Sequence, residues 1–343
     1  MTPRETFREQ ARVCAQMGSA FMGDLLALAA ERLSDATPIG ARLLNWPTDA
    51  SAGGDAIALR FAAGLHALKL DGEPGLVATY PPKPFDADAL WDAVEHVMET
   101  QPGPLHAWLD RPPQTNEPRR SAALVLGLAS LAAEGLDQIH LRELGASAGV
   151  NLMADHIAVN LGAQRIGAAS PALILTPDLN GTPGALAPYR VLSAEGCDRT
   201  PLRLDSAQDQ RALLSYTWPD QPERQARLST LFAQAEAEGP PVVAVADAGD
   251  WVGDQLAARP SEGTLVIWHS IFWQYPPEAT RTAMRAQIEA AGQAARDPLA
   301  WLRLEPDGQG PGAAITLDLW RPGTARETRV LARAGYHGEW LAF

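Results

Sequence analysis

The segment from His140 to Leu161 holds the residue types best suited to chemistry in this chain. It is HLRELGASAGVNLMADHIAVNL, a pattern that predicts a short strand ending near Glu143, a turn of glycine and small residues, and an amphipathic helix over 149–161. Such a turn gathers the first N–H groups of a helix at one point, where they and the helix dipole favour an anion or an electron-rich ligand. Glycines would let that ligand approach the backbone closely. We therefore expect a ligand-binding turn here.

Two known motifs match this turn. As E-x-G-x-S-x-G (Glu143, Gly145, Ser147, Gly149) it resembles the cofactor turn of class I S-adenosylmethionine-dependent methyltransferases. That resemblance implies that the glycines admit the aminocarboxypropyl arm of the cofactor and that the acid lies near its ammonium group. As G-x-S-x-G it resembles the nucleophile elbow of an α/β-hydrolase, with Ser147 as the nucleophile of a serine hydrolase. A third alternative is a turn that only binds a nucleotide or cofactor, without catalysis.

The elements around the turn favour the methyltransferase. Strands and helices alternate after residue 136, which predicts a parallel sheet, while the last two strands are too close for a crossover and should form an antiparallel hairpin. No HGGG-type oxyanion segment precedes the turn. The expected strands are 138–143, 190–195, 242–247, 264–269, 299–304, 314–320 and 328–333, and the expected helices between them are 206–215, 222–237, 250–258 and 278–292.

The sequence therefore predicts an α/β fold with two regions. Residues 136–343 should form a Rossmann-like domain that binds S-adenosylmethionine, with a seven-stranded methyltransferase-type sheet and a terminal antiparallel hairpin. Residues 1–135 should form a helical N-terminal cap, because apolar residues recur there at helical spacing without a convincing strand. Its expected helices are 4–33, divided at Gly18-Ser19, then 55–70, 87–99 and 118–134.

This layout also places further candidate residues at strand ends. Asp198 follows the second strand, where an acid would take both ribose hydroxyls, and Asp247 follows the third, where it would contact adenine. Asn151 could contribute to the mouth of the pocket. His269 ends the fourth strand and is the first candidate for a general base, because reaction chemistry in open α/β sheets sits outside the carboxyl ends of the strands. Tyr275 is the second catalytic candidate, and Trp273 and Gln274 could wall a substrate pocket.

Several motifs together resemble a widespread bacterial family of unknown function, over nearly the whole chain. They are Gln114-Thr-Asn116-Glu117 with Arg120, the first turn through Asn151, Gly196-Cys-Asp198-x-x-Pro-Leu, Trp218-Pro-Asp-Gln-x-x-Arg224, and His269-Ser-x-x-Trp273-Gln274-Tyr275. The resemblance implies a methyltransferase-like fold with a helical N-terminal region, but no activity.

The polar residues before Pro118 have two interpretations. Gln114, Asn116, Glu117 and Arg120 could bind the substrate, with Arg120 pairing a carboxylate bidentately. Alternatively, the segment caps the N-terminus of the following helix. The two roles are compatible.

The bulk composition excludes several classes of protein. A formal charge of −13 over 343 residues argues against nucleic-acid binding, which needs clustered Lys and Arg. Two cysteines, Cys14 and Cys197, without a C-x-x-C, predict neither a disulfide framework nor a zinc site, so no metal is expected. The charged N-terminus is unlike a signal peptide and no apolar run approaches the ~20 residues that span a bilayer. We therefore expect a cytoplasmic S-adenosylmethionine-dependent methyltransferase whose partner is a small-molecule substrate; the sequence does not specify the acceptor or the oligomeric state.

Overall fold

The computed structural model describes residues 1–343 and divides them into two compact units. The first unit comprises Met1–Thr115 and Ala207–Ala226, and the second comprises Asn116–Ser206 and Arg227–Phe343. The sequence suggested a single boundary near residue 135. The division of the structure falls earlier, within the Gln114–Glu117 motif, and it also assigns the separate segment 207–226 to the helical unit.

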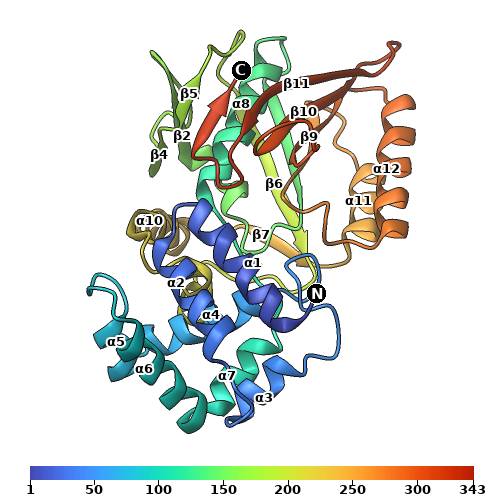
Figure 1. Ribbon diagram of the computed structural model, residues 1–343. Helices are drawn as coiled ribbons and strands as arrows, with labels where there is room; N and C mark the ends of the chain where they lie inside the picture. Colours follow the sequence, from blue (N-terminus) through green and yellow to red (C-terminus); the bar gives the residue numbers. More distant parts are fainter. The chain divides into compact units, whose positions relative to one another are not determined.

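The first unit is entirely helical (Figure 1). The expected break at Gly18-Ser19 is present: Ser19 caps the second helix, its hydroxyl accepting from the N–H of Met22 at 3.2 Å. Three short helices were not expected, and each begins with a proline in its first turn, a position that suits proline. The helices are α1 (Pro3–Gln16), α2 (Ala20–Arg32), α3 (Pro38–Leu44), α4 (Ile57–Leu70), α5 (Pro74–Thr79), α6 (Ala87–Thr100), α7 (Pro102–Leu109), α9 (Ala207–Tyr216) and the start of α10 (Pro222–Glu238).

The Trp218–Arg224 motif fastens the returning segment to α1 and α2. The carboxylate of Asp220 accepts from the hydroxyl of Ser19 at 2.6 Å and from the N–H of Phe21 at 3.0 Å. Trp218 is buried in the helical core, with the Arg224 guanidinium 5.3 Å from its ring centroid. Within this unit the motif is therefore a structural anchor.

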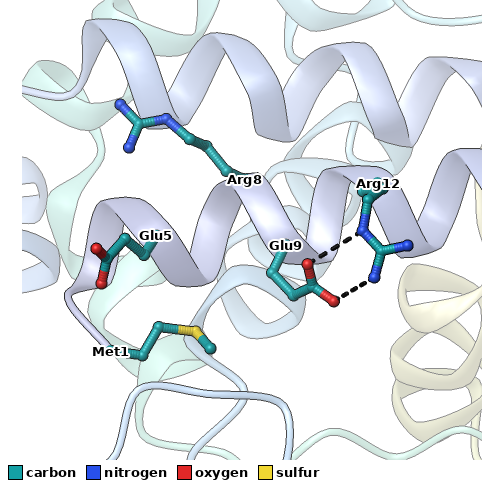
Figure 2. A pocket seen from close by; sticks show the side chains of 5 residues that line it. All are labelled: Met1, Glu5, Arg8, Glu9 and Arg12. Carbon is teal, nitrogen blue, oxygen red and sulfur yellow. Dashed lines mark hydrogen bonds and ion pairs between the residues drawn. The ribbon is translucent and has the colours of Figure 1, made fainter.

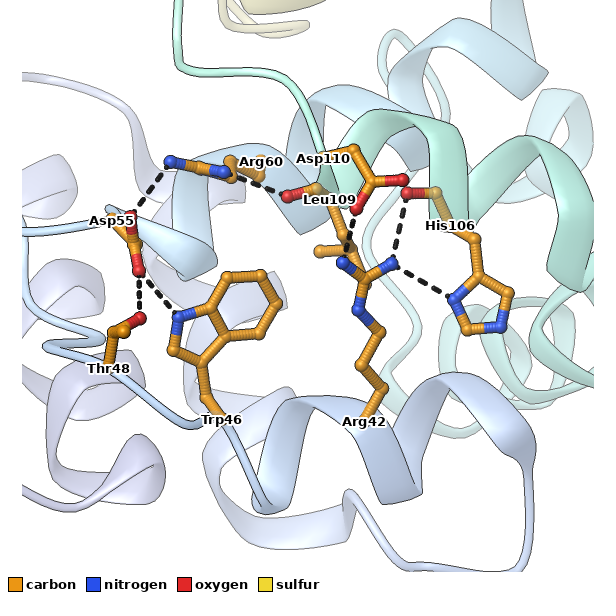
Figure 3. A network of polar contacts seen from close by, with 8 residues as sticks. All are labelled: Arg42, Trp46, Thr48, Asp55, Arg60, His106, Leu109 and Asp110. Carbon is orange, nitrogen blue, oxygen red and sulfur yellow. Dashed lines mark hydrogen bonds and ion pairs between the residues drawn. The ribbon is translucent and has the colours of Figure 1, made fainter.

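A polar network joins three helices of the helical unit (Figure 3). The ring of Trp46 lies between the guanidinium groups of Arg42 and Arg60, at 5.2 and 5.9 Å, and its indole N–H donates to Asp55 at 2.8 Å. Arg60 also donates to the carbonyl of Leu109 at 2.9 Å. These contacts join α3, α4 and α7, so the network stabilises the unit and needs no ligand to explain it.

The second unit is built on a nine-stranded sheet of mixed direction. Its strand order is β5-β12-β11-β10-β9-β8-β1-β6-β7, with parallel pairing from β7 to β9 and antiparallel pairing from β9 to β12. The strands are β1 (Gln138–Leu144), β5 (Asp178–Asn180), β6 (Arg190–Asp198), β7 (Val242–Val245), β8 (Thr264–Ser270), β9 (Leu299–Glu305), β10 (Ala313–Trp320), β11 (Glu327–Ala334) and β12 (Trp340–Ala342).

Helices cover both faces of this sheet. On one face α11 (Ala248–Ala257) and α12 (Glu278–Gln293) lie side by side (Figure 1). The other face of the sheet is covered by α8 (Ser121–Ala132), which follows the short helix η1 (Pro118–Arg120). This helix packs so closely that a Cβ on Gly127 would lie 2.2 Å from the side chain of Leu302 on β9. The large sheet with helices on both faces confirms the expected α/β class, and the antiparallel pairing of β10 with β11 confirms the predicted hairpin.

Two details of the sequence prediction are wrong. The large sheet has nine strands and not seven, because β5 and β12 extend it. The helix expected over 149–161 is instead a short 3-10 helix, η2 (Val150–His156), followed by β2 (Ile157–Leu161). With β3 (Gln164–Gly167) and β4 (Leu173–Leu175), β2 forms a separate three-stranded sheet that packs against α8.

Candidate functional site

The first turn lies where the strand order of the large sheet reverses. From β1 the chain goes to β6 and β7 on one side and then to β8 and β9 on the other. Ligands of open α/β sheets bind outside the carboxyl ends of the strands at such a switch point. The turn itself contains three residues in the left-handed region, Gly145 (φ 68°), Ser147 (φ 54°) and Gly149 (φ 79°). Its position therefore fits a functional site.

The N–H groups of the turn already have acceptors within the protein. The N–H of Ser147 donates to the carboxylate of Asp198 at 2.9 Å. The N–H groups of Ala148 and Val150 both donate to the side-chain oxygen of Asn116, at 3.1 and 3.3 Å. The expectation that free N–H groups at the start of a helix would bind an anion here is therefore wrong. The seven-residue 3-10 helix that follows is also too short to have a large dipole.

The glycines of the turn make room for protein atoms. A Cβ on Gly145 would lie 2.2 Å from the ring of Phe272, and one on Gly149 would lie 2.8 Å from Pro241 and 3.0 Å from Val243. The turn is thus packed under the segment that follows β8 and beside the start of β7. A ligand would have to bind at the rim of the turn, beyond these contacts.

Glu143 is buried at the end of β1 with only half of its carboxyl group paired. The side-chain amide of Asn151 donates to its Oε1 at 2.8 Å. Its Oε2 is buried without a hydrogen bond, and so is the indole N–H of Trp268, the residue opposite Glu143 on β8. Burial raises the pKa of Glu143 to about 8, and the nearby charge of Asp198 adds to the rise, while Asn151, Trp268 and the charge of Arg120 oppose it. At neutral pH the carboxyl group is therefore largely protonated.

Asp198 stands on the other side of the turn, at the end of β6. One carboxylate oxygen accepts from the N–H of Ser147 and the other from the N–H of Thr200, each at 2.9 Å. The side chain is only partly buried. Each carboxylate oxygen has two acceptor positions, so Asp198 can receive two further hydrogen bonds from a ligand.

His269 is fully buried at the end of β8 and forms a pair with a residue that the sequence reasoning missed. Its Nδ1 lies 2.6 Å from Oε1 of Glu305, the last residue of β9. Burial lowers the pKa of His269, although Glu305 opposes the shift. The signal for Glu305 was present in the sequence, because an acid ends this strand as Glu143 and Asp198 end theirs.

The aromatic segment after β8 is only partly accessible. Trp273 stacks on His269 with ring centroids 5.0 Å apart and an angle of 16° between the planes. Gln274 and Tyr275 are exposed, Tyr275 to 64%. The structure therefore brings Trp273 to the buried histidine and leaves Tyr275 exposed on the surface.

The polar residues around Pro118 have different roles in the structure. Asn116 holds the first turn, and Glu117 caps the short helix η1 by accepting from the N–H of Arg119 at 3.1 Å. Arg120 donates to the carbonyl of Tyr336 at 3.0 Å and is close enough to Glu143 to lower its pKa. Gln114 belongs to the helical unit. The capping interpretation is confirmed at Glu117, and substrate binding by these residues stays a prediction.

Asn151 and Asp247 take structural positions. Asn151 is buried, donates to Glu143 and accepts from the hydroxyl of Ser121 at 2.8 Å, so it does not lie at an open pocket mouth. Asp247 is exposed and caps α11, accepting from the N–H of Gly249 at 2.9 Å. An aspartate that follows a strand commonly accepts from the backbone just after it.

A hollow lies on the surface of α1 in the helical unit (Figure 2). It has a volume of about 550 Å³ and is lined by residues of the first few turns of the chain: Met1, Glu5, Arg8, Glu9 and Arg12. Glu9 and Arg12 pair with each other within the helix. With one wall and an internal ion pair, the hollow has none of the convergent groups of a binding site.

The fold and the turn define a doubly wound α/β protein with motif residues gathered at the switch point of its sheet. Residues 4–343 match the family described as "Uncharacterized protein conserved in bacteria (DUF2332)", and the chain belongs to this family. No curated protein matches the chain. None of its helices is both long and apolar enough to cross a membrane.

Proposed function

We propose that this protein binds S-adenosylmethionine at the first turn and transfers its methyl group to a small molecule. The observation that carries the proposal is the pair of carboxyl groups, Glu143 and Asp198, that flank one turn at the ends of neighbouring strands. The parallel strands β7-β6-β1-β8-β9 support it, because class I methyltransferases build their cofactor site at the centre of such an arrangement. The antiparallel hairpin of β10 and β11 agrees with the terminal hairpin expected of that layout, whereas β5, β12 and the sheet β3-β2-β4 lie outside it.

The groups left unpaired at the turn suit the two polar ends of this cofactor. Oε2 of Glu143 has no partner, and an ammonium group beside it would favour the ionised carboxylate and donate to it. The spare acceptor positions of Asp198 suit a pair of ribose hydroxyls. Asp247, exposed at the end of β7, is free to contact an adenine ring in addition to capping α11.

When bound, the cofactor supplies an electrophilic methyl group. The protein's part is mainly positioning, which can account for much of the rate of a two-substrate transfer. In this proposal the acceptor lies near the carboxyl end of β8, against Trp273 and Gln274, with Arg120 and Asn116 on the α8 side of the sheet. The setting is the cytoplasm, where the free cysteines Cys14 and Cys197 would remain reduced.

A serine hydrolase is the second candidate, because Ser147 has the positive φ of a residue on a strained elbow. Its chemistry would need the N–H of the next residue for the oxyanion. That N–H, from Ala148, is already bound to Asn116 at 3.1 Å. Treatment with a fluorophosphonate should therefore add no mass to Ser147. If Ser147 is labelled, the serine hydrolase replaces the methyltransferase as the proposed function.

A melting experiment tests the proposal directly. Millimolar S-adenosylmethionine or S-adenosylhomocysteine should raise the melting temperature, because a ligand that binds only the folded state stabilises it. ATP and NAD at the same concentration should not. The variant Asp198→Asn keeps an acceptor for Ser147 and should lose most of the shift, while Asp254→Asn, on the exposed side of α11, should keep it. No shift with either sulfur ligand would refute the proposal.

A further inference from the structure

Glu305 holds together the whole segment that follows β8. Its Oε1 accepts from three donors: Nδ1 of His269 at 2.6 Å, the N–H of Phe272 at 2.9 Å and the N–H of Trp273 at 3.2 Å. Ile271, between these donors, is in the left-handed region with a φ of 48°, a costly conformation for a β-branched residue. The strained turn is therefore maintained by the carboxylate.

The same carboxylate decides which nitrogen of His269 carries the proton. A carboxylate only accepts hydrogen bonds, so Nδ1 must donate and the lone pair of the neutral ring lies on Nε2. Nε2 is buried and has no hydrogen-bond partner. A buried acceptor without a partner is costly and rare in folded proteins. Nε2 of His269 is therefore available to a donor from outside the protein.

The surroundings of His269 are aromatic. The ring centroids of Trp273, Phe272 and Trp301 lie 5.0, 5.7 and 5.9 Å from that of His269. Such walls favour a flat, apolar molecule over a charged one. Trp273 covers the imidazole and is itself partly exposed, so the molecule would enter by displacing this side chain.

We propose that Nε2 of His269 takes the proton of the methyl acceptor, an aromatic or apolar molecule with an O–H or N–H group, and that Glu305 is the positioning residue of this base. The inference rests on the proposed function and names its substrate class. As the acceptor oxygen or nitrogen bonds to the methyl carbon, its proton moves to Nε2, and the sulfur keeps the electron pair of the broken S–C bond. The imidazolium formed is then paired with Glu305.

Nitrogen NMR of protein with isotope-labelled histidines tests whether His269 is the base. At neutral pH, His269 should show the Nδ1–H tautomer, with its signal assigned among the seven histidines by His269→Gln. Phenol, which carries a donor, should shift the Nε2 signal, and anisole, which has the same ring without a donor, should not. Equal shifts, or none with phenol, would overturn the proposal.

Two variants test the positioning role. Glu305→Gln keeps the acceptor oxygen but not the charge, so the tautomer should persist while kcat for methylation of phenol falls ~100-fold at nearly constant KM, the usual scale of a general base. Glu305→Leu should also lose the tautomer preference. The control Glu134→Gln removes an acid that pairs with Arg321 and Arg329 elsewhere in the same unit. It should change neither the tautomer of His269 nor kcat. An unchanged kcat in Glu305→Gln would overturn the role of Glu305.

The outcome also separates this inference from the proposed function. If the wild-type protein binds S-adenosylmethionine but His269 shows no response to phenol, only the base is refuted. If it binds no S-adenosylmethionine, the methyltransferase is refuted, and with it the acceptor assigned to His269.

Discussion

The side-chain amide of Asn151 donates a hydrogen bond of 2.8 Å to Oε1 of Glu143, and both side chains are buried. The bond joins the end of β1 to the 3-10 helix across the first turn. It satisfies only one oxygen of the carboxyl group, since Oε2 has no partner. The neutral side chains of Asn151 and Trp268 favour the ionised carboxylate but do not offset its loss of hydration, and this imbalance has a measurable consequence for stability.

Glu143 should make the protein less stable as the pH rises. Its pKa is about 8 in the folded protein against an ordinary 4.5, so between these values the folded state holds a proton that the unfolded state has lost. The loss of folding stability caused by this difference is absent below the lower pKa, grows between the two pKa values and reaches its full size above the upper one. In urea unfolding from about pH 5 to about pH 9, Glu143→Gln should gain up to about 4 kcal/mol relative to wild type. A difference that does not change with pH would contradict the buried, protonated acid.

Asn116 should be important for stability, because it is the acceptor for two N–H groups of the first turn. Asn116→Ala would leave the N–H groups of Ala148 and Val150 buried without partners, at a cost of about 2 to 4 kcal/mol in the free energy of unfolding. Asn116→Asp keeps an oxygen in place and should lose much less. Equal losses in the two variants, measured by urea unfolding, would show that the acceptor oxygen is not what matters.

Gly145 should tolerate no side chain because Phe272 occupies the space beside it. The matched control is Gly162, which has nearly the same backbone angle (φ 67° against 68°) but no atom within 4 Å of a Cβ. Gly162→Ala should cost only the strain of a left-handed alanine, about 1 to 2 kcal/mol. Gly145→Ala should cost about 1 to 3 kcal/mol more through overpacking, and should change the Trp273 fluorescence as the 271–273 segment moves. If the two substitutions lower the free energy of unfolding equally, Phe272 does not occupy the space beside Gly145.

Much of the fold follows from local patterns in the sequence. The strands β1 and β6 to β11 and the helices α9 to α12 were expected near their observed positions, because alternation, helical spacing and turn residues all act over a few neighbours. The short link between β10 and β11 determined their antiparallel pairing in the same way. The family motifs were also visible before the structure, and the family match confirms them.

The segment 149–161 shows why the rest required the tertiary structure. Val150, Met153, Ile157 and Leu161 form a helical stripe, yet Ile157 and Leu161 also fit the alternation of a strand. The strand forms because β3 and β4, later in the chain, pair with β2 and the resulting sheet packs against α8. Local periodicity cannot weigh partners that are distant in sequence.

The sequence by itself determined which chemical groups stand at the strand ends, including Glu143, Asp198 and His269. Only the tertiary structure decided which of them remain available to a ligand. Asn116 occupies the donors of the turn, Glu305 occupies Nδ1 of the histidine, and both come from other parts of the chain. The reason is physical: a hydrogen bond removes a group from recognition whatever the distance along the sequence, so the unpaired atoms of a site can be identified only when all its neighbours are in place.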